Sequence, residues 1–306
     1  MDVTVRARPI SHKERATSAL RLPNSDLITS RKWRFSPSLT AGLIIVCMIS
    51  SFAIFSDYIA PYDIAKMSMS ERLADPSWTH PMGTDLYGRD MFSRVLVGAQ
   101  LSLNVALTTT AISALPGILM GIMSGLFPGI LSKILSSLFD AWMAVPGLLL
   151  VVAMTAALGR STWVLALALG IAGVPTYYRQ ARAETLSVSN LLYVNAARSL
   201  GARDSHIMLH HILPNIMPKL LVLITLRIGG LLMTVSALSF IGLGAQPPEP
   251  EWGTLLAEGR EYMHQAWWLM FFPGVAIATT VFGLNLLGDG LRDFFDPNLT
   301  SHKSRS

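Results

Sequence analysis

Charged residues are scarce in this sequence. Asp, Glu, Lys and Arg together make up 14% of its 306 residues, whereas 51% are hydrophobic. A soluble domain of ordinary composition carries about 25% charged residues. The charges are also unevenly placed, since long uncharged stretches alternate with short charged ones. This pattern excludes an ordinary soluble protein and is typical of a chain that is partly solvated by hydrocarbon.

Cysteine and a phosphate-binding loop are the other notable absences. Cys47 is the only cysteine, so no disulfide can form within the chain. The sequence has no GxxxxGK[ST] motif, and no Gly is followed by Lys. Because the backbone N–H groups and the Lys of that motif hold the phosphates of ATP, hydrolysis of ATP by this chain is excluded. We therefore expect a protein that is not an enzyme and binds no cofactor itself.

What the sequence does contain is a series of long apolar runs. Most of them are apolar on all sides, unlike the one-sided stripe of a soluble helix. At 1.5 Å per residue they suit a hydrocarbon layer of roughly 30 Å. The runs cover residues 39–56, 101–127, 134–158, 163–178, 220–243 and 266–288. They predict an all-α polytopic membrane protein with about six transmembrane helices.

The polar segments between these runs predict the domain organisation. Residues 1–38 form a basic N-terminal arm, residues 39–290 the transmembrane domain and residues 291–306 a polar tail. Loops are predicted at 57–100, 179–219 and 244–265. Lys and Arg favour the cytoplasmic side. An N-terminus on that side places 17 of the 24 basic residues there, so we predict an N-in, C-in topology with 57–100 and 244–265 outside.

The inner loop, residues 179–219, combines small residues with helix-ending signals. Ala196, Ala197 and Gly201 are small residues on adjacent turns, and such a surface lets a partner approach the backbone closely. Gly201 can end one short helix so that the next leaves at an angle, and Pro214 suits the first turn of a further helix. The segment predicts two short helices joined by a glycine bend on the cytoplasmic face. An ordinary intracellular loop is the alternative.

Five motifs occur in order along the chain. They are GTDLYGRDMFSRV (83–95), HILPN (211–215), LSFIGLGAQPPEPEWG (238–253), NLLGDGLRD (285–293) and DPNL (296–299). With them, residues 39–298 resemble the C-type, or second, permease subunit of ABC importers of the dipeptide/oligopeptide/nickel group. The segment from residue 193 to 219 resembles the EAA loop of such permeases. The resemblance implies the type I ABC importer permease fold.

The resemblance also implies a role for the inner loop, which we name the coupling loop (179–219). In the family, this loop supplies a coupling helix that docks on an ATPase subunit. The matching residues here are Asn195, Ala196, Ala197, Gly201, Ala202, Asp204, Pro214 and Asn215. The sequence departs from the family at Asn195, where a Glu is usual. The departure removes a charge and leaves the small-residue face intact.

The same resemblance implies the partners and the location. We expect a homologous second permease, two ATPase subunits that bind ATP and Mg²⁺, and an extracytoplasmic substrate-binding protein. The chain itself is expected to be multi-pass in the bacterial cytoplasmic (inner) membrane, in contact with lipid and not with nucleic acid. The implied function is ATP-driven import of short peptides, with glutathione as one candidate.

Two charges fall inside predicted spans. Arg227 and Asp140 lie at similar depths from the cytoplasmic side, and charge at membrane depth is usually paired or functional. Three roles remain open for Arg227. It can pair with Asp140, reach the cytoplasmic interface along its aliphatic stem, or line the pathway and attract a substrate carboxylate.

The outer loop and a histidine cluster carry the remaining candidate residues. Asp85, Arg89 and Asp90 either form internal ion pairs or belong to a loop that contacts the binding protein or the second permease. His206 and His210 have the i,i+4 spacing of a zinc motif, but no Glu follows His206 as HExxH requires. No metal site is predicted.

Other functions compete with peptide import. Within the family, the alternative is import of nickel or a metal chelate. A stand-alone secondary transporter is more remote, because such proteins usually show internal repeats and broken half-helices and we find no convincing repeat. An intramembrane enzyme would need paired catalytic groups at depth, and Asp140 with Arg227 is not such a set.

Overall fold

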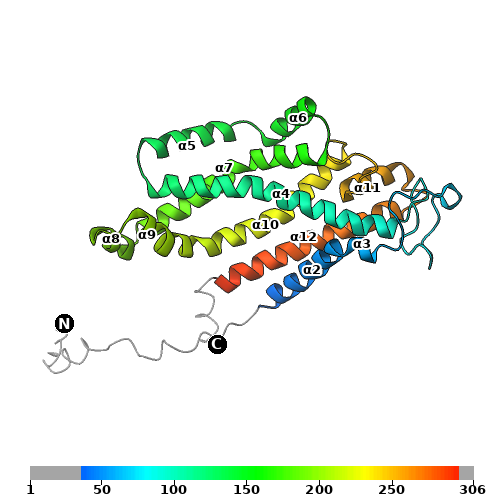
Figure 1. Ribbon diagram of the computed structural model, residues 1–306, viewed down its shortest axis with the longest axis horizontal. Helices are drawn as coiled ribbons and strands as arrows, with labels where there is room; N and C mark the ends of the chain where they lie inside the picture. Colours follow the sequence, from blue (N-terminus) through cyan, green and yellow to red (C-terminus); the bar gives the residue numbers. More distant parts are fainter. Residues whose placement is uncertain (1–35, 296–306) are drawn as a thin grey trace, which may run out of the picture. The chain divides into compact units, whose positions relative to one another are not determined.

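The computed structural model describes residues 36–295, and this part of the chain is built of helices (Figure 1). Its only β-type pairing is an isolated bridge between Thr84 and Asp90. The elements are α2 (Pro37–Ile54), α3 (Ser56–Ile59), η2 (Met69–Glu71), α4 (Met91–Leu126), α5 (Ile130–Met143), α6 (Gly147–Leu158), α7 (Thr162–Ser189), α8 (Leu192–Ser199), α9 (Asp204–Ile207), η3 (Met208–Ile212), α10 (Leu213–Phe240), α11 (Trp252–Gly259), η4 (Arg260–Tyr262) and α12 (Trp268–Phe295). The predicted all-α class is confirmed. Most of the predicted basic arm and tail lies outside the described residues.

The predicted count of six spans is not confirmed. Within residues 36–295, four helices are long and apolar enough to cross a membrane, namely α2, α4, α12 and the continuous segment Asp204–Phe240 that ends in α10. A fifth crossing is made if α5 and α6 together form one bent span. The apolar run at 163–178 lies in α7, whose second half carries Arg179, Arg182 and Glu184. The predicted run ends just before these charges, and α7 is not among the helices that are long and apolar enough to cross a membrane.

The predicted third span is broken. α5 and α6 meet at an angle of 78°, and Pro146 stands at the start of α6 with φ −57° and ψ 123°. Proline has no N–H to donate and disfavours helical backbone at the preceding residue. The helix is broken here, so residues 134–158 do not form the single straight span that composition alone allowed.

Two helices extend into predicted loops. α4 begins at Met91, inside the predicted outer loop 57–100, because the Asp90 side chain accepts a hydrogen bond from the Ser93 N–H at 2.8 Å and caps the helix. α7 continues to Ser189, inside the predicted coupling loop. The loop between α7 and α10 is thus shorter than the polar segment of the sequence.

Glycines on α4 set the distance to α7. A Cβ added at Gly117 would lie 2.7 Å from the Val174 carbonyl oxygen, and one at Gly121 would lie 2.5 Å from that of Tyr178. Small residues four apart let two membrane helices approach closely, as in small-xxx-small motifs. This contact makes α4 and α7 one packed pair.

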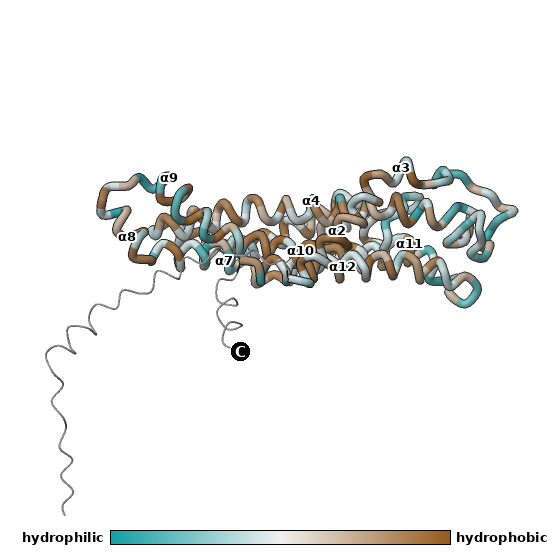
Figure 2. Tube along the Cα trace, turned by 90° about the horizontal axis from the view of Figure 1, so that it is seen from below, coloured by the Kyte–Doolittle hydropathy of each residue, from teal (hydrophilic) through white to brown (hydrophobic). Residues whose placement is uncertain are grey.

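Polar residues gather at the two ends of the helical unit. Figure 2 shows hydrophobic residues along the middle of the long helices, and hydrophilic residues toward α8 and α9 at one end and in the loops near α3 at the other. Trp252 and Trp268 are buried. Their indole N–H groups donate to the carbonyls of Val95 at 2.9 Å and Thr84 at 3.1 Å. The outer end is therefore a folded layer rather than a set of free loops.

Candidate functional site

The coupling loop contains the two short helices that the sequence predicts. α8 ends at Gly201, whose φ of +83° lies in the left-handed region. The Gly201 N–H donates to the Arg198 carbonyl and the Ala202 N–H to the Ala197 carbonyl, at 3.0 and 3.1 Å. These two bonds form a Schellman motif, which satisfies the last carbonyls of α8 and turns the chain into α9.

A buried cluster ties this loop to the long helices. Val194 of α8, Ile207 of α9 and Ile212 of η3 are fully buried. They pack in one cluster with Ile122 of α4 and Ala181 of α7. Because close-packed interiors transmit strain rather than absorb it, a displacement of α8 must move α4, α7 and α10 with it.

The exposed surface of the coupling loop carries large apolar side chains. Leu192 is 89% exposed and Leu200 is 88% exposed, although both lie at the end of the molecule that is rich in polar residues. Sequence reasoning missed them because it looked for small residues. The available signal was the presence of leucines in a polar segment beyond the spans.

The predicted coupling residues lie on this same loop. Exposed positions are Asn195, Ala196, Gly201, Asp204, Pro214 and Asn215, whereas Ala197 and Ala202 are half-buried. The Asn195 side chain donates to the Asn190 carbonyl at 3.3 Å. Asn195 therefore stabilises the start of its own helix α8, and it holds no charge toward a partner.

The three histidines of the loop stack on one another. The ring centroids of His206 and His210 are 4.2 Å apart at an interplanar angle of 19°, and His211 packs edge-on at 5.8 Å from His206. Among residues 36–295, no group of three or more His, Cys, Asp or Glu side chains is arranged to hold a metal ion.

Arg227 and Asp140 do not form the predicted intramembrane ion pair. Both side chains are exposed, and none of the ion pairs in the described part of the chain joins them. The Arg227 guanidinium carbon lies 5.9 Å from the centroid of the Tyr177 ring. A charge near the middle of a membrane helix costs about 2.5–3.5 kcal/mol, and a cation–π contact made by an exposed cation returns about 0.5–1 kcal/mol. Tyr177 thus offsets only part of the cost.

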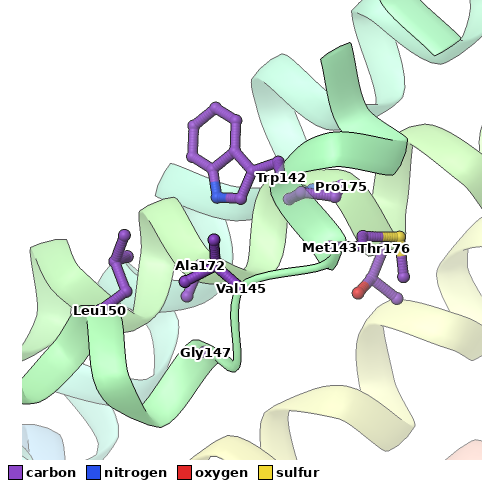
Figure 3. A pocket seen from close by; sticks show the side chains of 8 residues that line it. All are labelled: Trp142, Met143, Val145, Gly147, Leu150, Ala172, Pro175 and Thr176. Atoms are coloured by element: carbon purple, nitrogen blue, oxygen red, sulfur yellow. The ribbon is translucent and has the colours of Figure 1, made fainter. Parts of the chain in front are cut away.

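A cavity opens where α5 and α6 break. Its volume is about 170 Å³. It is lined by Trp142, Met143, Val145, Gly147, Leu150, Ala172, Pro175 and Thr176. Figure 3 shows Val145, on the segment between α5 and α6, and Gly147, at the start of α6, on the side of Ala172 and Pro175 of α7. The bend thus leaves a space beside α7 that a straight span would fill.

The charges of the outer loop form a buried network. Asp85 accepts from the Arg89 Nε at 2.6 Å and from the Arg94 Nη1 at 2.5 Å. Arg94 also donates to Glu258 of α11 at 2.7 Å, and Arg89 lies 3.4 Å from the same carboxylate. Two carboxylates thus face two guanidinium groups, and Asp85, Arg89 and Arg94 are each at most 1% exposed.

A second pair joins the same layer. His80 Nδ1 lies 2.8 Å from Asp90 Oδ1, and Asp90 is 3% exposed. Asp85, Arg89 and Asp90 therefore point into the outer layer, and contact of their side chains with a partner would require that layer to open. Glu258 was not predicted as part of this site, because it is 164 residues away from Arg94 in sequence.

Comparisons with known proteins agree on one protein family. Residues 117–301 match the family described as "Binding-protein-dependent transport system inner membrane component". The probable D,D-dipeptide transport system permease protein DdpC of Escherichia coli K12 is 41% identical over 269 residues, which cover 88% of this chain and 90% of that protein. The di/tripeptide transport system permease protein DppC of Pseudomonas aeruginosa is 40% identical, with 84% and 87% covered.

Two further similarities agree with these. The glutathione transport system permease protein GsiD of Pectobacterium atrosepticum is 39% identical over 265 residues, covering 86% of this chain and 88% of that protein. Among solved structures, a chain of the inward-facing MetNI methionine ABC transporter matches with a TM-score of 0.55 at 18% identity. The match covers 67% of this chain and 98% of that one, so the two share a fold.

Proposed function

Because this chain belongs to the family of binding-protein-dependent transport system inner membrane components, we propose that it is the C-type permease subunit of an ATP-driven importer of short peptides. Membership makes it a multi-pass membrane protein and one component of a transporter complex. The peptide substrate, the identity of the other subunits and the location in a bacterial inner membrane are the proposed parts.

One observation carries the choice of substrate. The three relatives described above are about 40% identical over most of both chains, and all are named for transport of short peptides. The matched segments cover 84–88% of this chain, far more than the coupling loop alone. This supports di- and tripeptides, glutathione included, as the substrate class.

The coupling loop supports docking of a separate ATPase subunit. Leu192 and Leu200 are large apolar side chains that are almost fully exposed outside the spans, and Leu191 and Tyr193 on either side of Leu192 are exposed as well. Contiguous exposed apolar residues mark protein interaction sites. We propose that an ATPase subunit covers them together with Ala196 and Gly201. ATP and Mg²⁺ would be bound by two such subunits, since this chain has no phosphate-binding loop.

The buried cluster below the loop suggests how docking is coupled to transport. Closure of the ATPase subunits would push on α8, and the packing of Val194 against α4 and α7 would pass that movement to the spans. With a homologous second permease forming the other half of the pathway, such movement would switch the pathway between inward-facing and outward-facing states. Peptide released by the binding protein would then enter from outside.

The test is uptake by the reconstituted complex in proteoliposomes. The chain, the second permease, the ATPase subunits and the binding protein are assembled, and labelled dipeptides, tripeptides, glutathione and nickel are offered with and without ATP. We expect peptide uptake that requires ATP and both ATPase subunits. Leu192→Glu with Leu200→Glu should abolish it and should release the ATPase subunits in a pull-down assay, whereas Leu131→Glu, on an exposed residue of α5, should leave ATPase binding intact.

Two results would contradict the proposal. Uptake that continues without any ATPase subunit, driven by an ion gradient, would identify a secondary transporter. ATP-dependent uptake of nickel or a nickel chelate without uptake of any peptide would retain the complex and replace the substrate.

A further inference from the structure

Arg227 lies on a side of α10 that carries small and polar side chains C-terminal to it. The residues at i+3, i+7 and i+10 from Arg227 are Gly230, Thr234 and Ala237, and they share its side of the helix. Many exposed positions carry larger apolar side chains, such as Leu115 on α4, Phe282 on α12 and Met233 on α10 itself. Small and polar side chains around a charge favour a water-filled or protein-lined face over lipid.

There is open space beside the arginine. A Cβ added at Gly230 would meet no atom within 4 Å, and Arg227 itself is exposed. The guanidinium is held toward the Tyr177 ring on α7, 5.9 Å from its centroid, and not along α10 toward the inner interface. The Arg227 side chain therefore does not reduce its desolvation cost by extending to the cytoplasmic interface.

No carboxylate of the described chain neutralises Arg227. The acidic partners of the ion pairs within residues 36–295 are Glu71, Asp85, Asp90, Glu184 and Glu258, and none of them is paired with Arg227. An exposed guanidinium at membrane depth needs an anion or water. Its planar fork of donors matches a carboxylate with two parallel hydrogen bonds.

We propose that Arg227 is a substrate-binding residue that receives the carboxylate of the transported peptide in the translocation pathway. The inference rests on the proposed function and adds a recognition element to it. A peptide with a free C-terminus has an α-carboxyl pKa of about 3.3–3.7, so it carries this anion at neutral pH. Arg227 then selects anionic ends on a face that is otherwise neutral.

The first experiment asks whether Arg227 faces the pathway. In a Cys47→Ser background, which removes the only cysteine, Arg227→Cys and Gly230→Cys are treated with a charged, water-soluble thiosulfonate in the assembled complex. We expect both to react, and Leu232→Cys, at a position that is 0% exposed, to remain unmodified. Protection of both Arg227→Cys and Gly230→Cys from the reagent would place this face against a subunit or lipid and overturn the proposal.

The second experiment asks whether Arg227 recognises the carboxylate. Uptake of a tripeptide and of its C-terminal amide is measured for the unsubstituted chain, Arg227→Lys and Arg227→Gln in the full complex. We expect Arg227→Gln to weaken uptake of the free acid by roughly 10- to 100-fold, the range for loss of a hydrogen bond to a charged group. Uptake of the amide should be unchanged, and Arg227→Lys should retain most of the preference for the acid.

The possible results separate the explanations. Equal loss of both substrates in Arg227→Gln would indicate a structural pair with an acidic residue of the second permease and would refute carboxylate binding. If the binding protein rejects the amide, the cysteine experiment is repeated with peptide-loaded binding protein present. Slower modification of Gly230→Cys would then support carboxylate binding at Arg227, and an unchanged rate of modification would contradict it. If the unsubstituted complex imports no peptide, the proposed function fails. The thiosulfonate reaction still shows whether the Arg227 side of α10 is accessible to water.

Discussion

At the scale of single residues, burial decides what the charges of the outer layer do. Asp85 contacts two arginines from a position that is 1% exposed. Removal of one partner from a buried ion pair leaves a charge that neither water nor protein satisfies. The side chain of Asp85 is therefore a structural element of the layer, whereas the surface of the layer remains available for contact with a partner.

Asp85→Asn should destabilise the chain by about 3–5 kcal/mol, because Arg89 and Arg94 lose a buried counterion. The measurement is chemical or thermal unfolding of the purified chain in detergent. Glu71→Gln is the control, since the Glu71 side chain is 52% exposed and 3.8 Å from His80, and it should change stability by at most about 0.5 kcal/mol. A stable Asp85→Asn protein that fails only to engage the binding protein would instead favour the contact role.

The bend between α8 and α9 in the coupling loop depends on the backbone conformation of Gly201. Its φ of +83° is strained for a residue with a side chain, and no atom would obstruct a Cβ there. Gly201→Val should therefore cost about 1–2 kcal/mol through the left-handed conformation alone and should reduce ATP-driven uptake severalfold. Gly201→Asn should be tolerated, since Asn adopts this region more readily. Uptake that is equal in the two variants would contradict this reading.

At the scale of elements, helix contacts depend on where side chains are absent. Gly121 of α4 places its backbone against the Tyr178 carbonyl of α7. Gly121→Ala should force the helices apart and destabilise the chain by about 1–3 kcal/mol, the range for overpacking. Gly129→Ala is the matched control, because an added Cβ there meets nothing within 4 Å. The unfolding midpoint in detergent measures the stability of both variants. Equal midpoints would show that the α4–α7 contact accommodates the added methyl group without loss of stability.

The element that departs most from expectation is the pair α5–α6. Apolar composition over residues 134–158 predicts one span, but Pro146 and the 78° bend divide it. The bend creates the cavity beside Ala172 and Pro175 of α7. A proline in a membrane helix is compatible with either a mild kink or a full break, and only packing against α7 distinguishes the two.

At the scale of the whole molecule, the N-in, C-in topology is the prediction to test. In the Cys47→Ser background, Leu200→Cys and Trp78→Cys place thiols on exposed residues at the two polar ends of the helical unit. A membrane-impermeant maleimide should label Trp78→Cys in right-side-out vesicles and Leu200→Cys in inside-out vesicles. The opposite pattern would reverse the orientation, and labelling of both residues from one side would contradict the crossing of the membrane between them.

The sequence predicted the parts that depend on local physics. Apolar composition identified the helices now seen as α2, α4, α10 and α12, and the Gly201 signal identified the bend between α8 and α9. The motifs from residue 83 to 299 indicated the family that the comparisons show. The six-span count is not confirmed, because α7 is charged in its second half and α5–α6 is bent.

What only the tertiary structure decided is how distant residues meet. The sequence by itself determined that the chain is a helical membrane protein and that it contains no GxxxxGK[ST] motif, because hydropathy and short motifs are local properties. It could not show that Glu258 forms an ion pair with Arg94. Nor could it show that Asp140 and Arg227 form no ion pair in the part of the chain that the structure describes. Such pairings depend on helix rotation and close packing, which arise from the whole set of contacts and not from any one segment.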